Sequence, residues 1–180
     1  LSWLEGVKIP FKSPPRCNSS PSCRVNYHLK DVEPLLRGLI SSGAIEKCSP
    51  LPDQILSPFF LRTKKDGENK RFILNLKWLN EFIDAPHFKL EDYRTCMGVM
   101  NPGCYMATID LRDAYYTVPR HKNHRKFLRF KVDEQLFEFT CLPFGLNIAP
   151  YLFTKLMKPV TTNLRSQGIT CVLYLDDWII

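Results

Sequence analysis

The spacing of hydrophobic residues predicts two helices. From Asp31, apolar residues recur at helical intervals, which predicts a short amphipathic helix with Asp31 as its cap, Gly43 at its end, and an apolar face formed by Val32, Leu35, Leu36, Leu39 and Ile40. A longer helix is predicted from about Asn147, with Pro150 in its first turn, a kink at Pro159, and a buried stripe of Phe153, Leu156, Met157, Val160 and Leu164. Residues 1–30 are proline-rich and lack periodicity, so they predict an irregular lead-in.

Strand patterns predict two hairpins. The first hairpin joins residues 58–63 to residues 71–76 through a turn that contains Asp66-Gly67 and is rich in lysine. The second joins residues 127–132 to residues 136–140. The first hairpin therefore has a basic tip, for which a solvated lysine-rich turn is the simplest interpretation of Lys65 and Lys70.

Two further strand regions end at acidic residues. Residues 105–110 alternate between apolar and polar positions and predict a strand that ends at Asp110, followed by a tight passage into a helical turn over residues 111–116. Residues 171–175 and 178–180 are apolar and flank Asp176 and Asp177.

Composition limits the class of protein. The chain has 180 residues, 44% of them hydrophobic, which is enough for one compact unit or two small lobes. Its apolar runs are far shorter than a membrane span. The net charge of +7 suggests a polyanionic partner but leaves a nucleic acid, an acidic protein and a membrane surface open.

The cysteines favour a reducing environment. Their number, seven, is odd, and no C-x-x-C pair occurs, so we expect an intracellular protein of the cytoplasm or nucleus. A zinc site from Cys17, Cys23 and His28 lacks the usual pair spacing. His121 and His124 lie in a polar stretch without the helical context of a metal pair.

Carboxylates gather where apolar strands end. Burying Asp110, Asp176 and Asp177 beside strands would cost several kcal/mol unless a divalent metal neutralised them. Three carboxylates around two Mg²⁺ ions form the kind of site that nucleotidyl transfer needs. On the acids alone, the alternative is an Asp-Asp turn with an unrelated Asp at a strand end.

Neighbouring motifs change this balance. Tyr174-Leu175-Asp176-Asp177 fits the pattern Y-x-D-D, and it follows SPFFLRTKKDGENKRFILNLKWLN (57–80), DLRDAYYTVP (110–119) and LPFGL (142–146) in order. Together these segments resemble the successive motifs of retroelement reverse transcriptases of the retroviral and LTR type. RKFLRF (125–130), LPFGLNIAP and YLDDWII look most like the DIRS group, with gypsy-like elements second.

The resemblance implies an α+β polymerase right-hand fold. Residues 31–84 and 118–148 would form the two parts of the fingers, and residues 85–117 and 149–180 would form the palm, truncated after YLDD. The partners implied are an RNA or DNA template, a DNA or RNA primer, and dNTPs, without a membrane. The chain does not begin with Met and ends three residues after Asp177, so we expect a piece of a longer product whose thumb and RNase H domain follow.

The resemblance also implies roles for individual residues. Asp110, Asp176 and Asp177 would hold two Mg²⁺ ions, with Mn²⁺ as a substitute and the carbonyl of Leu111 as a further ligand. The primer 3′-hydroxyl would then attack the α-phosphate of a dNTP. Contacts to the β- and γ-phosphates would come from Lys64 and Arg71, which we expect to face each other across the hairpin, and from the backbone N–H groups of Asp113 and Ala114.

Aromatic and loop residues complete the implied site. Tyr115 would lie under the sugar and exclude a 2′-hydroxyl, while Tyr116 is the core residue of the pair. Phe144 stands where retroviral enzymes have Gln, so a polar contact to the sugar is lost. Pro143, Gly145, Lys77 and Tyr174 would contact the template or primer.

Three functions remain to be distinguished. The first is RNA- and DNA-directed DNA polymerase, whose isolated fragment we expect to be inactive in processive synthesis. The second is a non-enzymatic remnant that binds nucleic acid weakly. The third, an RNA-templated RNA polymerase, is disfavoured by Tyr115. Trp78 and Trp178 lie in apolar runs and are expected to pack in the core, and we expect exposed apolar surface where palm strands are missing.

Overall fold

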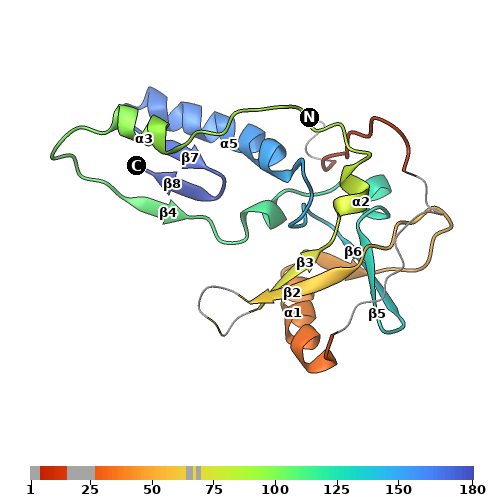
Figure 1. Cartoon of the computed structure of the whole chain (residues 1–180). Coiled ribbons are helices and arrows are strands. Elements are labelled where there is room, and N and C mark those ends of the chain that lie inside the picture. Colours follow the sequence, from red (N-terminus) through yellow and green to blue (C-terminus); the bar gives the residue numbers. More distant parts are fainter. Residues whose placement is uncertain (1–4, 16–26, 64–66, 68–69) are drawn as a thin grey trace. The chain divides into compact units, whose positions relative to one another are not determined.

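The computed structural model describes residues 5–15, 27–63, 67 and 70–180, which form parts of two compact units (Figure 1). Unit 1 comprises Leu1–Ala85 and Tyr115–Asn147, and unit 2 comprises Pro86–Ala114 and Ile148–Ile180. Each unit is therefore built from two separate stretches of the chain. Lys64, Cys17 and Cys23 lie outside the described residues.

Helix α1 of unit 1 spans Leu29–Ser41 and begins earlier than the sequence predicts. His28 is its N-cap residue, so the prediction of Asp31 as the cap is wrong. Asp31 lies in the first turn, where a carboxylate interacts well with the helix dipole, and it pairs with Lys70 at 2.8 Å. Gly43, at φ 71°, follows the helix as predicted.

The apolar face of α1 is narrower than predicted. Val32, Leu36 and Leu39 are buried, and Leu35 is half-buried. Ile40 is 41% exposed. The helix therefore uses the positions i, i+4 and i+7 for its buried contacts.

Two antiparallel sheets complete unit 1. Strands β2 (Phe59–Thr63) and β3 (Lys70–Leu74) form the first predicted hairpin. Strands β1 (Ile45–Lys47), β5 (Arg129–Val132) and β6 (Gln135–Phe139) form a sheet in the order β1-β6-β5, which contains the second predicted hairpin. Asp133 turns between β5 and β6 with a φ of 48°, a conformation that Asp tolerates better than most residues.

An aromatic cluster joins the two sheets of unit 1. The rings of Phe59 and Phe72 stack at 4.7 Å, and Phe130 contacts both of them as well as Phe137 and Phe139. Phe130 and Phe139 are at most 1% exposed. These side chains make up the centre of the unit's core.

Short helices connect the larger elements. Helix α2 (Lys77–Asn80) follows β3, and helix α4 (Lys122–Arg125) precedes β5. The 3₁₀ helix η2 (Ala114–Thr117) follows Asp113, whose φ is 53°. The predicted passage from a strand into a helical turn over residues 111–116 is confirmed.

Unit 2 contains a small sheet and two helices. Strands β4 (Thr108–Asp110), β7 (Val172–Tyr174) and β8 (Asp177–Ile179) form an antiparallel sheet in the order β4-β8-β7. Helix α3 (Tyr93–Val99) and helix α5 (Ala149–Ser166) belong to the same unit (Figure 1). Its core is formed by Cys171, Leu173 and Trp178, against which Met157 and Leu164 of α5 pack.

The predictions for α5 hold only in part. Phe153 is buried, whereas Leu156, Met157 and Leu164 are half-buried and Val160 is 45% exposed. Leu152 and Thr161 are buried instead. The helix continues as one element through Pro159.

None of the described helices, α5 included, has the length and apolar character needed to cross a membrane.

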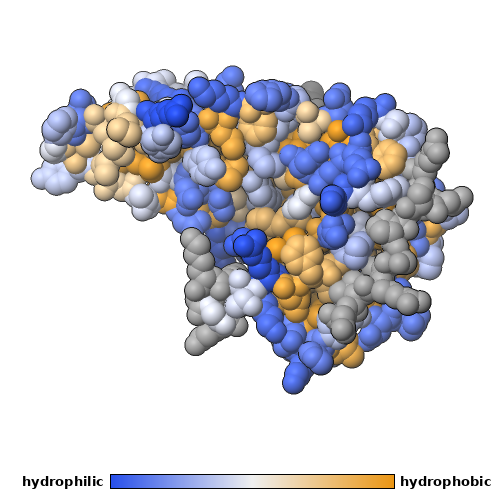
Figure 2. All heavy atoms as spheres, in the orientation of Figure 1, coloured by the Kyte–Doolittle hydropathy of each residue, from blue (hydrophilic) through white to orange (hydrophobic). Residues whose placement is uncertain are grey.

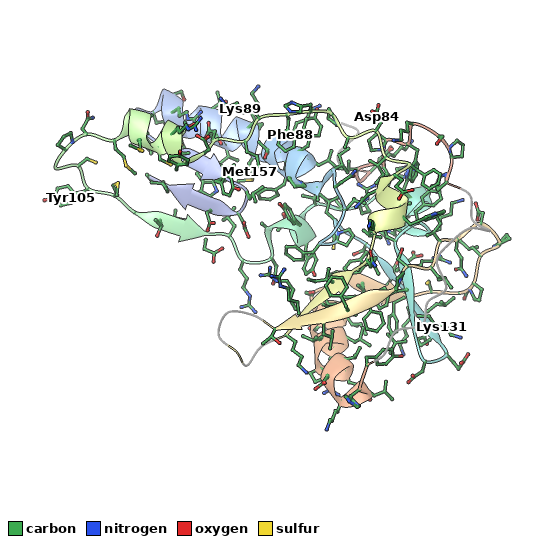
Figure 3. The ribbon with its side chains drawn as sticks, viewed as in Figure 1. Asp84, Phe88, Lys89, Tyr105, Lys131 and Met157 are labelled. Atoms are coloured by element: carbon green, nitrogen blue, oxygen red, sulfur yellow. The ribbon has the colours of Figure 1, made fainter. Side chains whose placement is uncertain are left out.

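The strand predicted over residues 105–110 is shorter than expected and lies on the surface. Only Thr108–Asp110 is a strand, and all three of its residues are exposed. Tyr105 projects fully into solvent (Figure 3), and Met106 and Ile109 are 57% and 46% exposed. Tyr93 and Met97 of α3 are 66% and 69% exposed. Figure 2 shows orange apolar spheres among the blue ones on the surface of unit 2.

Candidate active site

Register brings two of the three acidic residues together in unit 2. Asp110, the last residue of β4, is paired directly with Asp177, the first residue of β8. Directly opposed residues in an antiparallel pair have Cα atoms about 4.5–5.5 Å apart. Two carboxylates from different parts of the sequence therefore begin at neighbouring backbone positions.

The third carboxylate lies in the turn between β7 and β8. Tyr174 pairs with Asp177 and closes a two-residue turn of Leu175 and Asp176. Leu175 has a φ of 56°, which a residue other than glycine adopts at a cost. The Leu111 N–H donates to the carbonyl of Asp176 at 2.9 Å, so the segment after β4 is fastened to this turn.

The expectation that these carboxylates are buried is wrong. Asp110 and Asp177 are exposed, and Asp176 is half-buried, so water already solvates them. Among the residues that the structure describes, no three His, Cys, Asp or Glu side chains converge closely enough to hold a metal ion. The chemistry of the donors nevertheless fits Mg²⁺, which binds carboxylate oxygens and keeps several water ligands.

Unit 1 holds the predicted aromatic residues together. The Phe144 ring lies 5.4 Å from the rings of both Tyr115 and Tyr116, with its plane tilted steeply to each. Tyr116 also contacts Phe139 of the core at 6.2 Å, although Tyr115 and Tyr116 are both half-buried. The Arg71 guanidinium lies 5.0 Å from the centre of the Phe144 ring, within cation–π range.

The loop that carries Phe144 is fixed by close backbone contacts. Gly145 has a φ of 102°, and a Cβ atom there would lie 2.6 Å from the Leu74 carbonyl oxygen, so this position requires glycine. Asn80 donates to the Gly145 carbonyl at 2.8 Å and accepts from the Asn147 N–H at 3.0 Å. Pro143, two residues before Gly145, is buried.

Asn80 is a site residue that sequence reasoning missed. It lies in the motif 57–80, but its partners are 65 and 67 residues away in the chain. Asn at the end of a helix is common, and this position gave no separate signal.

The basic hairpin differs from its prediction. Arg71 pairs with Arg62, and Lys70 pairs with Thr63. Lys64, which the sequence predicts to face Arg71, lies outside the described residues. Lys70 is also not simply solvated, because its ammonium group bonds to Asp31 and holds the pKa of that carboxyl below its usual value. Arg71 itself is exposed and reaches Phe144.

Two predicted template or primer residues lie on the surface. Lys77 is the first residue of α2 and is exposed. Tyr174, at the end of β7, is 47% exposed. Trp178 is buried in the core of unit 2 as expected, while Trp78 is half-buried and packs on Phe82 at 4.9 Å.

Histidines 121 and 124 have structural roles in unit 1. His121 caps α4 by accepting from the Asn123 N–H at 3.2 Å. His124 Nδ1 accepts from the Ile9 N–H at 3.1 Å. Burial, with a smaller effect of the Arg120 charge, lowers the pKa of His124 to about 4.

An ion pair beside β7 also escaped prediction. The Arg165 guanidinium bonds to the Glu91 carboxylate at 2.7 Å, and this bond raises the pKa of Arg165 above its ordinary value. The pair borders a cavity of about 450 Å³ that is lined by Phe88, Tyr151, Leu173 and three lysines. Figure 3 labels Phe88 and Lys89, which mark the segment that carries Glu91 past α5.

Comparison with known proteins gives consistent matches. Residues 63–180 match the family model described as reverse transcriptase (RNA-dependent DNA polymerase). The chain is 26% identical to the retrovirus-related Pol polyprotein from transposon 297 of Drosophila melanogaster, over 100% of this chain and 18% of the polyprotein. It is 29% identical to the corresponding protein from transposon gypsy of the same organism, over 81% of this chain and 14% of the polyprotein.

Solved structures show the same fold. The foamy viral protease-reverse transcriptase in complex with double-stranded DNA superposes with a TM-score of 0.74 at 20% identity, covering 99% of this chain and 31% of that chain. The same viral protein in complex with an RNA/DNA hybrid gives a TM-score of 0.70 at 20% identity, covering 96% of this chain and 23% of that one. The α+β polymerase fold is confirmed, and the chain spans less than a third of each of these relatives.

Proposed function

Because this chain belongs to the reverse transcriptase family, we propose that it supplies the catalytic part of an RNA-directed and DNA-directed DNA polymerase. The reaction is attack of a primer 3′-hydroxyl on the α-phosphate of a dNTP, with release of pyrophosphate. The observation that carries this proposal is the direct pairing of Asp110 with Asp177, next to the hydrogen bond between Leu111 and Asp176.

In unit 2, we propose that Asp110, Asp176 and Asp177 hold two Mg²⁺ ions, with Mn²⁺ able to replace them. The Leu111 carbonyl is a further candidate ligand. Bound metal would activate the 3′-hydroxyl and stabilise charge on the leaving oxygen. The protein's own contribution is to start the carboxylates from adjacent backbone positions and to leave them open to water and substrate.

In unit 1, we propose that Arg71 binds nucleotide phosphate, together with Lys64. Arg71 is exposed and lies over the Phe144 ring, which limits its motion while leaving N–H donors available for phosphate oxygens. Tyr115 would lie under the sugar and select dNTPs. Phe144 supports both residues by contact.

The remaining assignments follow the family. The backbone N–H groups of Asp113 and Ala114 would bind phosphate, and Pro143, Gly145, Lys77 and Tyr174 would contact template or primer. We propose that unit 1 corresponds to the fingers and unit 2 to part of the palm. The finer lineage, the DIRS group, and an intracellular location in the cytoplasm or nucleus are proposals of the same kind.

The test is primer extension on an RNA template with Mg²⁺, using this chain fused to the segment that follows the matched region in the transposon 297 Pol polyprotein. Asp176→Asn should reduce incorporation by more than about 10³-fold, because it removes a charge that stabilises the transition state. Asp84→Asn is the matched control, since Asp84 is an exposed aspartate of unit 1 outside the site (Figure 3).

Three results would contradict the proposal. Unchanged extension by Asp176→Asn would remove the metal-ligand assignment. No incorporation by the wild-type fusion, combined with salt-sensitive binding of nucleic acid, would favour the non-enzymatic remnant. Equal use of rNTPs and dNTPs by the wild type would instead favour an RNA polymerase.

A further inference from the structure

An ion pair completes the free edge of strand β7. In the order β4-β8-β7, one side of β7 pairs with β8, and none of the strands that the structure describes pairs with its other side. On that side the Leu173 N–H donates to Glu91 Oε2 at 2.9 Å. The Cys171 carbonyl accepts from Arg165 Nε at 3.2 Å and from Nη2 at 2.7 Å.

Glu91 and Arg165 act as one unit in this arrangement. Arg165 Nη2 also donates to Glu91 Oε1 at 2.7 Å, so the two side chains bond to each other and to the strand. The strand offers one N–H and one carbonyl two residues apart, as it would to a neighbouring strand. The ion pair satisfies both groups in place of a fourth strand.

Both side chains come from well-anchored segments. Glu91 directly precedes Asp92, the N-cap of α3, whose carboxylate accepts from the Arg94 N–H at 3.0 Å and the Thr95 N–H at 3.2 Å. Arg165 lies in the last turn of α5. The ends of two helices therefore meet at the edge of β7.

The strand that they hold leads directly into the acidic turn. Leu173 is three residues before Asp176, and Tyr174 pairs with Asp177. We propose that Glu91 and Arg165 are positioning residues that hold β7, and through it Asp176 and Asp177, in the arrangement that binds metal. This inference rests on the proposed function of the two aspartates.

The Glu91–Arg165 pair is better suited to holding β7 in position than to stabilising the whole fold. The side chains of Glu91 and Arg165 are 32% and 44% exposed, and ion pairs of such exposure contribute little to folding. Hydrogen bonds between charged side chains and a backbone edge are stronger and local. Because β7 has only three residues, it depends on its edge contacts to stay ordered.

The experiment measures two properties of the 180-residue chain. Hydrogen exchange reports on the Leu173 amide, and electron paramagnetic resonance reports the affinity for Mn²⁺. Glu91→Ala and Arg165→Ala should each speed exchange at Leu173 about tenfold or more and weaken Mn²⁺ binding about five- to tenfold. The double variant should lose no more Mn²⁺ affinity than the more affected of the two single variants, because the pair acts as one unit.

Two further variants separate positioning from general damage. Glu91→Gln keeps an acceptor for the Leu173 amide, so it should restore slow exchange and most of the Mn²⁺ affinity. Glu46→Ala is the control, because Glu46 forms an equally long-range pair with Arg125 in unit 1 without touching β7. It should change neither measurement.

The outcomes also separate this inference from the proposed function. Unchanged Mn²⁺ affinity in Glu91→Ala and Arg165→Ala, while Asp176→Asn loses it, would overturn the positioning role alone. Additive losses would also overturn the single-unit model. If Asp176→Asn keeps full Mn²⁺ affinity, the metal assignment itself fails. If Glu91→Ala unfolds, the test rests on Glu91→Gln. Loss of Mn²⁺ affinity in Glu91→Gln, despite slow exchange at Leu173, would contradict the inference.

Discussion

Two arginines of unit 1 are equally buried but have opposite surroundings. Arg129 is 4% exposed and Arg120 is 1% exposed. Every guanidinium nitrogen of Arg129 has a partner: Nε and Nη2 bond to Glu138 at 2.7 and 2.5 Å, and Nη1 bonds to the Ser49 carbonyl and to Gln54. Among the described residues, none of the Arg120 guanidinium nitrogens has one.

The difference lies in which side chains surround each arginine. Arg129 of β5 is paired directly with Glu138 of β6, so the sheet register places a carboxylate beside its guanidinium. Arg120 precedes α4, and its side chain lies near Cys141, whose pKa is raised to about 12 by burial and which therefore remains a neutral thiol. Burial without a partner lowers the pKa of Arg120 to about 9. The buried guanidinium thus has hydrogen-bond partners at Arg129 and none at Arg120 among the described residues.

The strongest test of this comparison removes the partner of Arg129. Glu138→Ala should lower the free energy of unfolding of unit 1 by about 3–5 kcal/mol, because it leaves an uncompensated charge in the core. Urea unfolding, followed by hydrogen exchange of the β5 and β6 amides, measures the effect. Glu134→Ala is the control, because its exposed pair with Lys131 should contribute less than about 0.5 kcal/mol. Equal effects of the two variants would contradict the assigned role of Glu138.

Removing the charge at Arg120 should raise the free energy of unfolding of unit 1, the opposite of the effect of Glu138→Ala. Arg120→Met keeps a long, flexible apolar side chain and eliminates the unpartnered guanidinium, so unit 1 should gain about 1–3 kcal/mol. The same substitution at Arg129 should destabilise the unit, since it would leave Glu138 unpaired. Destabilisation by Arg120→Met in the same urea experiment would show that the guanidinium has a favourable interaction.

Local sequence patterns are sufficient to predict some features of the structure. The hairpins, the position of α1 and the acidic turn follow from local patterns, because alternation, Asp-Gly turns and motif spacing are properties of neighbouring residues. Asp110, Asp176 and Asp177 are predicted as metal ligands by motifs that follow one another in order, and that role stays a prediction. Their exposure does not follow from the motifs, because it depends on what packs against the sheet.

Long-range polar pairs could not be predicted. Glu91 and Arg165 are 74 residues apart, and Gln54 and Arg129 are 75 residues apart, so no local pattern links them. No sequence pattern indicates that Arg120 and Arg129 are buried, and both would be expected on a basic surface. A count of the lysines and arginines therefore exceeds the number of basic side chains on the surface by at least these two, although Arg129 is buried together with Glu138 and leaves the net surface charge unchanged.

A smaller effect follows from the influence of Arg120 on His124. The pKa of His124 is about 4 in the folded chain, below its ordinary 6.5, chiefly because of burial and secondly because of the Arg120 charge. Between pH 6.5 and 4 the unfolded chain therefore binds more protons, and stability falls as the pH is lowered through this range. Because His124 is partly exposed, we expect a loss of about 1 kcal/mol between pH 6.5 and 5 after allowing for screening.

Comparing the wild type with His124→Asn isolates this contribution. Asn keeps an acceptor for the Ile9 N–H but does not titrate, so the variant should lose less stability than the wild type between pH 6.5 and 5 in urea unfolding. In Arg120→Met, the His124 pKa measured by NMR should rise toward its ordinary value, because one positive charge beside the ring is gone. An unchanged His124 pKa in that variant would mean that the Arg120 charge does not lower it, and that the two arginine sites differ in hydrogen bonding but not in their effect on neighbouring charges.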